Sequence, residues 1–236
     1  MTRQLILMRH GETLYNATRR MQGQMDTELS EVGIKQAELA ADYLENMTIG
    51  RIISSDLSRA HETAKAVARR VGGDVVVDKR LRETHLGCWQ GMNHEEVDEL
   101  FPGARALWRH DASWAPPEGE SRLEVAQRAR AVIDELMADY SEWDDATVLV
   151  VAHGGTIAAL TSALLELSHE QYPIFSGLKN TCWAQLTARP RYYPGSLDAD
   201  GEGDPVIPQA RFTSDNVSDA QWYLDGWNMS APKRGM

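Results

Sequence analysis

Two uninterrupted apolar runs, at 5–8 and 148–152, are the clearest features in the pattern of hydrophobic and polar positions. A continuous apolar run of this length is typical of a parallel strand that is covered on both faces. Each run is followed closely by a histidine and a glycine, His10-Gly11 and His153-Gly154. In an open α/β sheet, ligands bind beyond the carboxyl ends of such strands. The pattern therefore predicts that two histidines distant in sequence lie in one pocket.

Three longer segments carry apolar residues at helical spacing and predict amphipathic helices. The first begins after Ser30, a good N-cap, and the third begins at Ser121, where Glu124 has capping-box spacing. The residues predicted to face the core are Ile34, Ala37, Ala41 and Leu44 in 30–44; Ala60, Ala64, Val67 and Val71 in 57–71; and Val125, Ala129, Val132, Ile133, Leu136 and Tyr140 in 121–140. Further strands are predicted at 51–55, 74–78 and 182–188, and a further helix at about 155–166. This order of elements predicts a three-layer α/β domain.

The region from 81 to about 119 breaks this regularity with glycines, prolines and the three tryptophans Trp89, Trp108 and Trp114. A long irregular insertion in a compact domain usually carries function, so we expect a cap over the pocket at about 86–120. The tryptophans could stack on a sugar ring, but we expect each of them to belong to the core of the cap.

The end of the chain differs in composition from the rest. Residues 193–208 are rich in Gly, Asp and Pro, and we expect them to form a mobile surface excursion. The segment 221–227 is too aromatic for a disordered tail, so we expect it to pack on the domain. We therefore predict a single domain over 1–236, with the cap and a C-terminal extension from about 189.

Composition narrows the classes of function. The 236 residues carry a formal net charge of −11, which argues against general nucleic-acid binding. An anionic substrate would have to be held by a local cluster of positive groups. No apolar stretch is long enough to cross a bilayer, and no signal-peptide pattern is found, so no membrane partner is expected. Cys88 and Cys182 are too few for a disulfide framework, and we expect a cytoplasmic protein.

The paired histidines suggest phosphoryl chemistry, although one histidine after a strand is most often structural. A neutral imidazole has one unprotonated ring nitrogen near pH 7 and can take a phosphoryl group as phosphohistidine. The transfer then needs positioning and stabilisation of charge on the phosphoryl oxygens. Arginine suits this task because its planar fork binds pairs of oxygens. Arg9 beside His10, and Arg59 at the start of the helix after the second strand, are the candidates.

With these residues the chain resembles the histidine phosphatase superfamily, also called the phosphoglycerate mutase-like family. The resemblance is carried by Arg9-His10-Gly11, by His153-Gly154, and by the pattern Ser-x-x-x-Arg-Ala-x-x-Thr from Ser55 to Thr63. It implies a three-layer α/β/α phosphoglycerate mutase-like fold with a mostly parallel central sheet and a small cap insertion. It also implies that the two histidines and two arginines of the phosphate pocket are His10, His153, Arg9 and Arg59.

A leaving alkoxide needs a proton, and Glu83 is the candidate general acid. The pattern Leu-x-Glu followed by Gly-x-Trp-x-Gly, from Leu81 to Gly91, is similar to the branch of the family whose proton donor is this glutamate. The acid phosphatase and phytase branch instead has an aspartate directly after its second histidine, where this chain has Gly154. In an apolar, partly closed pocket Glu83 would stay protonated at neutral pH. The alternative is a surface carboxylate beside Arg82.

The resemblance implies further phosphate contacts from the amides of Asn16 and Gln22 and from backbone amides near glycine. The glycines concerned are Gly11, Gly154 and Gly155, and Thr13 is a weaker candidate. The remaining histidines match no catalytic position and form no recognisable metal-ligand spacing. They are His61, His85, His94, His110 and His169. We therefore expect a phosphomonoesterase with no metal and no organic cofactor.

Four stretches are similar to those of the actinobacterial glucosyl-3-phosphoglycerate phosphatases, a group within the family. They lie at 21–30, 81–91, 114–121 and 222–230. That group removes phosphate from glucosyl-3-phosphoglycerate to give glucosylglycerate, a step toward methylglucose lipopolysaccharides. The resemblance implies a small-molecule phosphate ester as substrate and a homodimer.

Three alternatives remain: a broad-specificity phosphatase, a cofactor-dependent phosphoglycerate mutase and an inactive phosphate-binding module. The region 91–121 is too short and too poor in basic residues to resemble the mutase cap, since it holds only Arg105 and Arg109. An inactive member should have lost a histidine, an arginine or the glutamate, and none is missing here.

Overall fold

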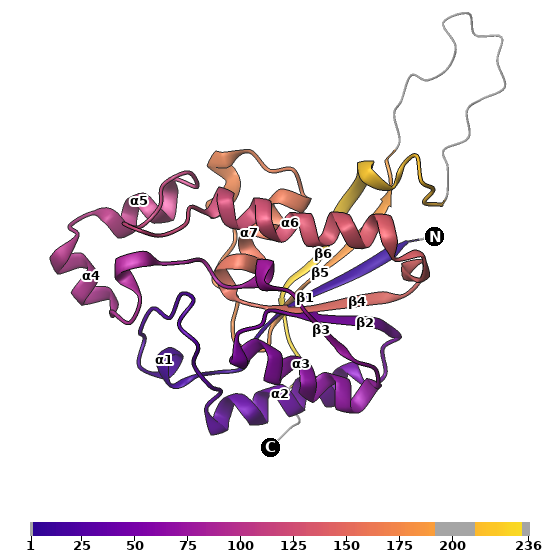
Figure 1. Cartoon of the computed structure of the whole chain (residues 1–236), viewed down its shortest axis with the longest axis horizontal. Coiled ribbons are helices and arrows are strands. Elements are labelled where there is room, and N and C mark those ends of the chain that lie inside the picture. Colours follow the sequence, from indigo (N-terminus) through magenta and orange to yellow (C-terminus); the bar gives the residue numbers. More distant parts are fainter. Residues whose placement is uncertain (1, 192–210, 233–236) are drawn as a thin grey trace, which may run out of the picture.

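A mixed sheet of six strands forms the centre of the structure, a computed structural model that describes residues 2–191 and 211–232 (Figure 1). The strands are β1 (Arg3–Arg9), β2 (Ile49–Ser54), β3 (Val75–Val77), β4 (Thr147–Ala152), β5 (Trp183–Pro190) and β6 (Ala220–Met229). They are ordered β3-β2-β4-β1-β5-β6 across the sheet. The first four in this order run parallel, and β5 pairs antiparallel with both β1 and β6. The predicted α/β class with a mostly parallel sheet is confirmed.

Helices cover both faces of the sheet in the described part of the chain. Helices α2 (Glu31–Leu44) and α3 (Ser58–Val71) lie on one face, and α6 (Arg122–Asp139) and α7 (Gly154–Leu164) lie on the other (Figure 1). The shorter helices α1 (Leu14–Ala17), α4 (His94–Leu100) and α5 (Ala104–His110) lie beyond the carboxyl ends of the parallel strands. Short 3-10 helices occupy Lys79–Leu81, Gly87–Trp89, Ser141–Trp143, His169–Ile174 and Val217–Asp219. The three layers agree with the predicted architecture.

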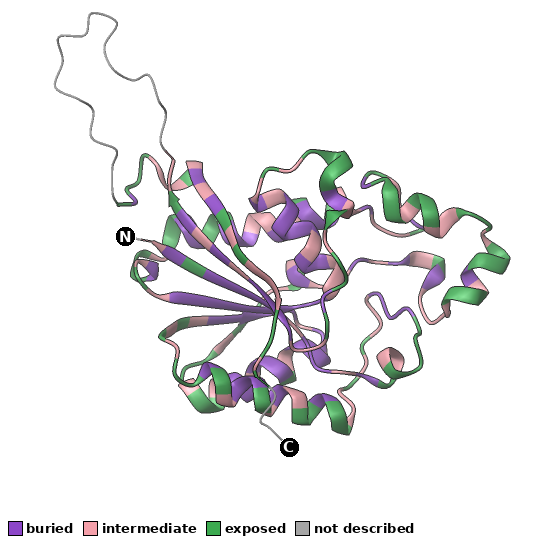
Figure 2. Ribbon diagram, turned by 180° about the vertical axis from the view of Figure 1, so that it is seen from behind, coloured by how far each residue is buried: buried purple, intermediate pink, exposed green. Residues whose placement is uncertain are grey.

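The side chains of β1 alternate between two cores. Leu5 and Leu7 pack in the core under α6 and α7, whereas Ile6 and Met8 pack in the core over α2 and α3. Figure 2 shows the strands buried along most of their length, with exposed residues on the outer surfaces of the helices. Burial on both faces explains why the apolar runs of β1 and β4 are uninterrupted.

The predicted helix starts at Ser30 and Ser121 are confirmed. The Ser30 hydroxyl accepts a hydrogen bond from the amide of Gly33 at 3.1 Å, and Ser121 forms a capping box with Glu124. The prediction that Ile34 faces the core is wrong, because its side chain is 52% exposed. The buried face of α2 begins at Gly33 instead, where an added Cβ would lie 2.0 Å from the backbone carbonyl oxygen of Glu12. This close approach holds α2 against the loop after β1.

The cap region is more regular than the sequence pattern indicated. It contains α4 and α5, and α4 begins with a capping box formed by Asn93 and Glu96. These helices have seven residues each, which is too short to give a periodic apolar stripe in the sequence. The fully buried Trp89 forms the centre of a separate apolar cluster, with Trp108 and Trp114 packed against it. All three tryptophans therefore contribute to the cap core, as predicted.

Strand β6 completes the edge of the sheet beside β5. Its Trp222 is 3% exposed and contacts Trp143, with ring centroids 6.2 Å apart. The aromatic segment at 221–227 thus packs on the domain. The predicted mobile excursion at 193–208 lies outside the described residues.

Candidate active site

His10 and His153 lie side by side where β1 and β4 end. These strands are adjacent and parallel, and their register pairs Arg9 with Ala152. The next residue of each strand therefore leaves the sheet at the same edge. The two imidazole centroids are 5.1 Å apart, with 60° between the ring planes. The structure thus brings together the two histidines that the sequence placed after separate strands.

The ring of His10 is held in one orientation. Its Nδ1 lies 2.6 Å from the carbonyl oxygen of Gly11. A carbonyl oxygen can only accept, so Nδ1 carries the hydrogen and Nε2 of the neutral ring keeps its lone pair. Burial, with the nearby charges of Arg9 and Arg59, holds the pKa of His10 well below its ordinary value of 6.5. The ring is therefore neutral at pH 7, with a free nitrogen suited to nucleophilic attack.

His153 is fully buried next to this ring. Neither of its ring nitrogens has a hydrogen-bond partner among the described residues. Burial, together with the charge of Arg59, holds its pKa well below 6.5. A buried polar group without a partner is costly in a folded protein and commonly marks a ligand position. His153 can thus hydrogen-bond a group that enters between the two histidines.

Two arginines provide the positive charge of the site. Arg59, at the start of α3, is 1% exposed and donates to the carbonyl oxygens of Met25 and Gly23, each at 2.8 Å. Burial lowers its pKa to about 10, so it stays charged at neutral pH. Arg9 donates to the carbonyl of Leu178 at 2.6 Å. The Nε atoms of both arginines are buried without a partner among the described residues, which leaves each with a donor for an anion.

The side-chain amide oxygens of Asn16 and Gln22 both accept hydrogen bonds from neighbouring residues of the protein. The oxygen of Gln22 accepts hydrogen bonds from the hydroxyls of Thr13, at 2.9 Å, and of Thr27. The oxygen of Asn16 accepts from the amide of Thr13 and from the side chain of Asn180, both at 3.2 Å. Both residues line the pocket. Their NH₂ groups are therefore left to donate to an anion there.

Glu83 is reached by several donors. Its carboxylate accepts from the backbone amides of Thr84 at 2.8 Å and of Gly155 and Thr156 at 3.1 Å each. The expected apolar surroundings of Glu83 are thus wrong, because the first turn of α7 presents its unpaired amides to the carboxylate. The alternative of a free surface carboxylate beside Arg82 is also wrong, since Arg82 forms a bidentate pair with Asp56.

Most of these groups line one pocket of about 320 Å³, whereas the fully buried His153 is not part of its lining. Its lining includes Arg9, His10, Asn16, Gln22, Arg59 and Glu83 from the predicted set. Gly155 lines the pocket, whereas Gly154, the first residue of α7, does not. A Cβ added to Gly155 would lie 2.6 Å from Oε1 of Glu83, so the glycine permits the close contact between helix and carboxylate.

Sequence reasoning missed several residues of the site. Asn180 donates to the carbonyl of His10 at 3.0 Å as well as to Asn16, but it lies in a loop without a pattern. Thr63 accepts from the amide of Gly11 at 3.0 Å and donates to the carbonyl of Arg59 at 2.7 Å. Thr63 is the last residue of the pattern from Ser55 to Thr63, and its place in that pattern was a signal that could have identified it as a site residue. Further lining residues from the first loop and the cap include Arg19, Arg20, His94 and Trp108.

Within residues 2–191 and 211–232, no group of three or more His, Cys, Asp or Glu side chains is arranged to hold a metal ion. None of the helices in these ranges is long and apolar enough to cross a membrane. The donors that line the pocket include arginines and side-chain amides.

Comparison with known proteins agrees with this geometry. The model of the histidine phosphatase superfamily (branch 1) matches residues 5–193. The chain belongs to this superfamily, and its similarity to phosphatases over nearly its whole length identifies it as a phosphatase, a hydrolase of phosphoric monoesters. The family model thus covers most of the chain.

Individual relatives are similar over nearly the whole chain. A glucosyl-3-phosphoglycerate phosphatase of Mycolicibacterium vanbaalenii is 47% identical over 97% of this chain and 96% of its own length. A solved mycobacterial glucosyl-3-phosphoglycerate phosphatase in complex with VO3 is 45% identical, with a TM-score of 0.82, and the match covers 97% of this chain and all of that one. A probable phosphoglycerate mutase of Yersinia pestis is 41% identical over 70% of this chain and 75% of its own.

Proposed function

We propose that the protein hydrolyses glucosyl-3-phosphoglycerate to glucosylglycerate and inorganic phosphate through a phosphohistidine on His10. The proposal rests chiefly on the environment of His10, a neutral ring whose Nδ1 is held by Gly11 and which lies near the charges of Arg9 and Arg59. No other neutral nitrogen nucleophile among the described residues has this combination of orientation and positive surroundings.

In the first half of the reaction, Nε2 of His10 attacks the phosphorus atom and the bond to the substrate oxygen breaks. Arg9 and Arg59 stabilise the charge on the phosphoryl oxygens, with the NH₂ groups of Asn16 and Gln22. His153 donates a hydrogen bond to the group in transfer, and the N-terminus of α7 at Gly154, a residue that does not itself line the pocket, adds a positive field for the same charge. Glu83 acts at this step in its protonated form and gives its proton to the leaving oxygen of the sugar acid.

In the second half, water attacks the phosphohistidine and the nitrogen–phosphorus bond breaks. Glu83, now a carboxylate, accepts the proton of this water, so the same group serves both halves. Inorganic phosphate leaves and Nε2 of His10 regains its lone pair. Each step balances with substrate and water alone, and the proposed mechanism uses no cofactor.

The substrate is inferred from the relatives. Two relatives that are similar over 97% of the chain are named glucosyl-3-phosphoglycerate phosphatases, and this share of the chain includes the cap. The mutase alternative is supported by the Yersinia relative, which matches a smaller share of this chain. Of the two arginines in the cap, Arg105 is paired with Asp98 and Arg109 does not line the pocket, so the cap supplies no arginine for the second phosphate that a mutase must hold. These observations favour hydrolysis.

The cap at about 86–120 and the extension from about 189 belong to this proposal as parts of one domain. We also propose a cytoplasmic homodimer. Cytoplasmic location is supported by two cysteines that are both free thiols. Association of two copies is supported by the edge strand β3, whose Val76 and Val77 are 42% and 46% exposed. Light scattering after gel filtration tests the dimer, and a mass of about 26 kDa would contradict it.

A substrate panel tests the proposed function. Phosphate release is measured with glucosyl-3-phosphoglycerate, 3-phosphoglycerate and p-nitrophenyl phosphate. Binding energy from the glucosyl group can accelerate the chemistry, so kcat/KM for 3-phosphoglycerate should be at least about tenfold lower. Equal values for the two glycerate esters would indicate a broad-specificity phosphatase. Transfer of phosphate between glycerate positions without release would indicate a mutase.

A further inference from the structure

Arg19 is a charged residue that lines the pocket and has no role in the proposed phosphoryl transfer. It lies in the loop between α1 and α2, after the Asn16 of α1 and before Gln22, and it lines the same pocket. Its guanidinium has neither a hydrogen bond nor an ion pair within the part of the chain that the structure describes. In a protein with 35 acidic and 24 basic residues, an arginine in a pocket without an acidic partner is available for an anionic ligand.

The backbone of Arg19 is unfavourable for an arginine. Its φ is 55°, in the left-handed region that favours glycine. It occupies the residue after the C-cap of α1 in a Schellman motif, because its amide donates to the carbonyl of Asn16 at 3.1 Å and the amide of Arg20 donates to that of Tyr15 at 2.8 Å. Glycine would fit this backbone better, so the local fold gives no reason for the side chain.

Glu166 provides a comparison within the same chain. It has a φ of 54° and occupies the same position of a Schellman motif at the end of α7. There the amide of Glu166 donates to Ala163 and the amide of Leu167 donates to Ser162. The side chain of Glu166 is bound by Arg191, so a structural contact accounts for the residue. Arg19 has no such contact among the described residues.

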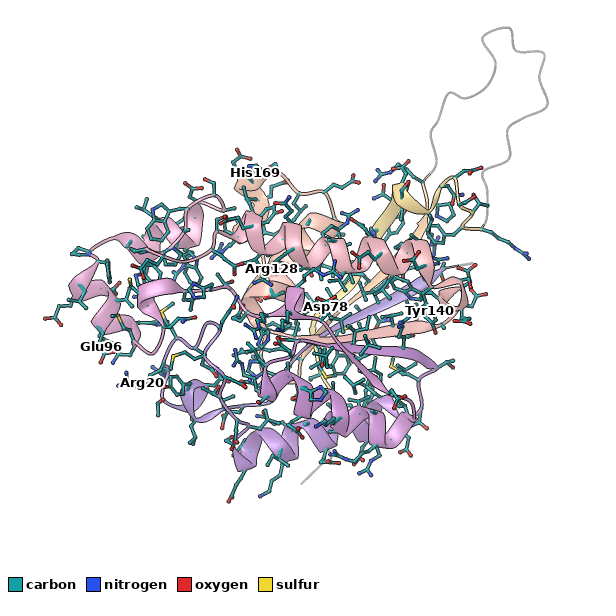
Figure 3. All side chains as sticks on the ribbon, in the orientation of Figure 1. Arg20, Asp78, Glu96, Arg128, Tyr140 and His169 are labelled. Carbon is teal, nitrogen blue, oxygen red and sulfur yellow. The ribbon has the colours of Figure 1, made fainter. Side chains whose placement is uncertain are left out.

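Arg20, the neighbour of Arg19, is already engaged. It donates to the carbonyl of Gly91 at 2.7 Å and to the carboxylate of Glu96 at 3.3 Å. Figure 3 shows Arg20 and Glu96 side by side, which joins the first loop to the start of α4. Arg20 therefore holds the loop against the cap, and among the described residues Arg19 is the arginine of this loop without a partner.

We propose that Arg19 binds the carboxylate of the glycerate part of the substrate and so sets the preference for carboxylate-bearing phosphate esters. This inference rests on the proposed function. In a 3-phosphoglycerate ester only a short carbon chain separates the phosphate from the carboxylate, so both anions must lie within one small pocket. The inner arginines, Arg9 and Arg59, take the phosphate. The planar fork of Arg19 matches the two oxygens of the carboxylate.

The test compares two substrates in the wild type and in Arg19→Gly. One substrate is glucosyl-3-phosphoglycerate, and the other is its analogue with a hydroxymethyl group in place of the carboxylate. The ratio of their kcat/KM values should fall at least about tenfold in Arg19→Gly, since a hydrogen-bonded charge is lost. Arg19→Lys should keep part of the preference. The thermal midpoint of Arg19→Gly should be at or above that of the wild type, because glycine suits the backbone.

Glu166→Gly is the matched control, since it makes the same backbone change outside the pocket, and its substrate ratio should stay within twofold of the wild type. A wild-type ratio near one, or an unchanged ratio in Arg19→Gly, would overturn the role of Arg19. Failure of the wild type to hydrolyse glucosyl-3-phosphoglycerate would instead overturn the proposed substrate. In that case 3-phosphoglycerate and glycerol 3-phosphate form the test pair, and an unchanged ratio again overturns the role of Arg19.

Discussion

The carboxylate of Glu83 accepts a hydrogen bond from the backbone amide of Gly155, with 3.1 Å between Oε2 and the amide nitrogen. The amide of Thr156 donates to the other oxygen at the same distance. The candidate acid is thus held by the N-terminus of α7, the helix that begins directly after His153. The position of Glu83 relative to His153 is therefore set by the helix that follows His153 in the chain.

We expect Gly155→Ala to displace the carboxylate of Glu83. The new Cβ would lie 2.6 Å from Oε1 of Glu83, and the carboxylate would have to move. We expect kcat on the sugar phosphate to fall at least about tenfold, equivalent to about 1.4 kcal/mol of transition-state stabilisation. Gly154→Ala is the matched comparison, because its Cβ meets Arg9 only at 3.6 Å. Steady-state kinetics that show the larger loss in Gly154→Ala would contradict this interpretation.

Glu83→Gln should slow hydrolysis of the sugar phosphate far more than that of p-nitrophenyl phosphate. An alkoxide leaves only with a proton, whereas nitrophenolate leaves without one. Glutamine keeps the size of the side chain but cannot supply that proton. The comparison is made by kcat on the two substrates, and equal losses would mean that Glu83 is not the general acid.

Arg59→Lys should be poorly active. Arg59 holds the carbonyls of Met25 and Gly23 with its two terminal nitrogens and still has Nε for an anion. An ammonium group cannot serve these separated positions, so we expect kcat/KM to fall by about a hundredfold or more, about 2.7 kcal/mol. Circular dichroism and the thermal midpoint serve as controls for folding. A variant as active as the wild type would exclude a role for the fork.

The two buried histidines should make the free energy of unfolding depend on pH. Burial holds the pKa values of His10 and His153 well below 6.5 in the folded protein, whereas in the unfolded chain both take up protons near 6.5. Between these values the unfolded state binds more protons, so stability falls as the pH decreases below about 6.5. Each histidine contributes about 1.4 kcal/mol per pH unit.

Urea unfolding of the wild type and of His153→Gln from pH 7.5 to 5.5 measures this effect. The variant lacks one titrating ring, so its stability should fall less steeply below pH 6.5. Identical slopes for the two proteins would show that His153 is protonated as easily in the fold as in the unfolded chain.

The parts of the site that follow strand ends could be predicted from the sequence. His10 and His153 each follow a run buried on both faces, and parallel strands deliver their next residues to one edge. Arg59 was found by its pattern and by its place at a helix start. Asn16 and Gln22 came from the resemblance alone, since nothing local shows which end of an amide faces the pocket.

The remaining features depend on contacts between distant segments. The polar surroundings of Glu83 come from the amides of α7, more than seventy residues away in the chain. Asn180 reaches His10 from a loop that carries no pattern. The spacing of Ile34 from Ala37, Ala41 and Leu44 fits one face of a helix and predicts that it is buried. The close contact of Gly33 with Glu12 instead turns the neighbouring face of α2 toward the core. The short helices of the cap gave no periodic signal at all.

The central claim is that His10 carries the phosphoryl group, and rapid-quench labelling tests it most directly. The wild type is mixed with substrate labelled in its phosphate and quenched in base within the first turnover, and the labelled peptide is identified. We predict a label that is stable in base, labile in acid and located on His10. His10→Ala should take no label and keep less than about one part in a hundred of the activity. A label on another residue, no label during rapid turnover, or substantial activity in His10→Ala would contradict the account.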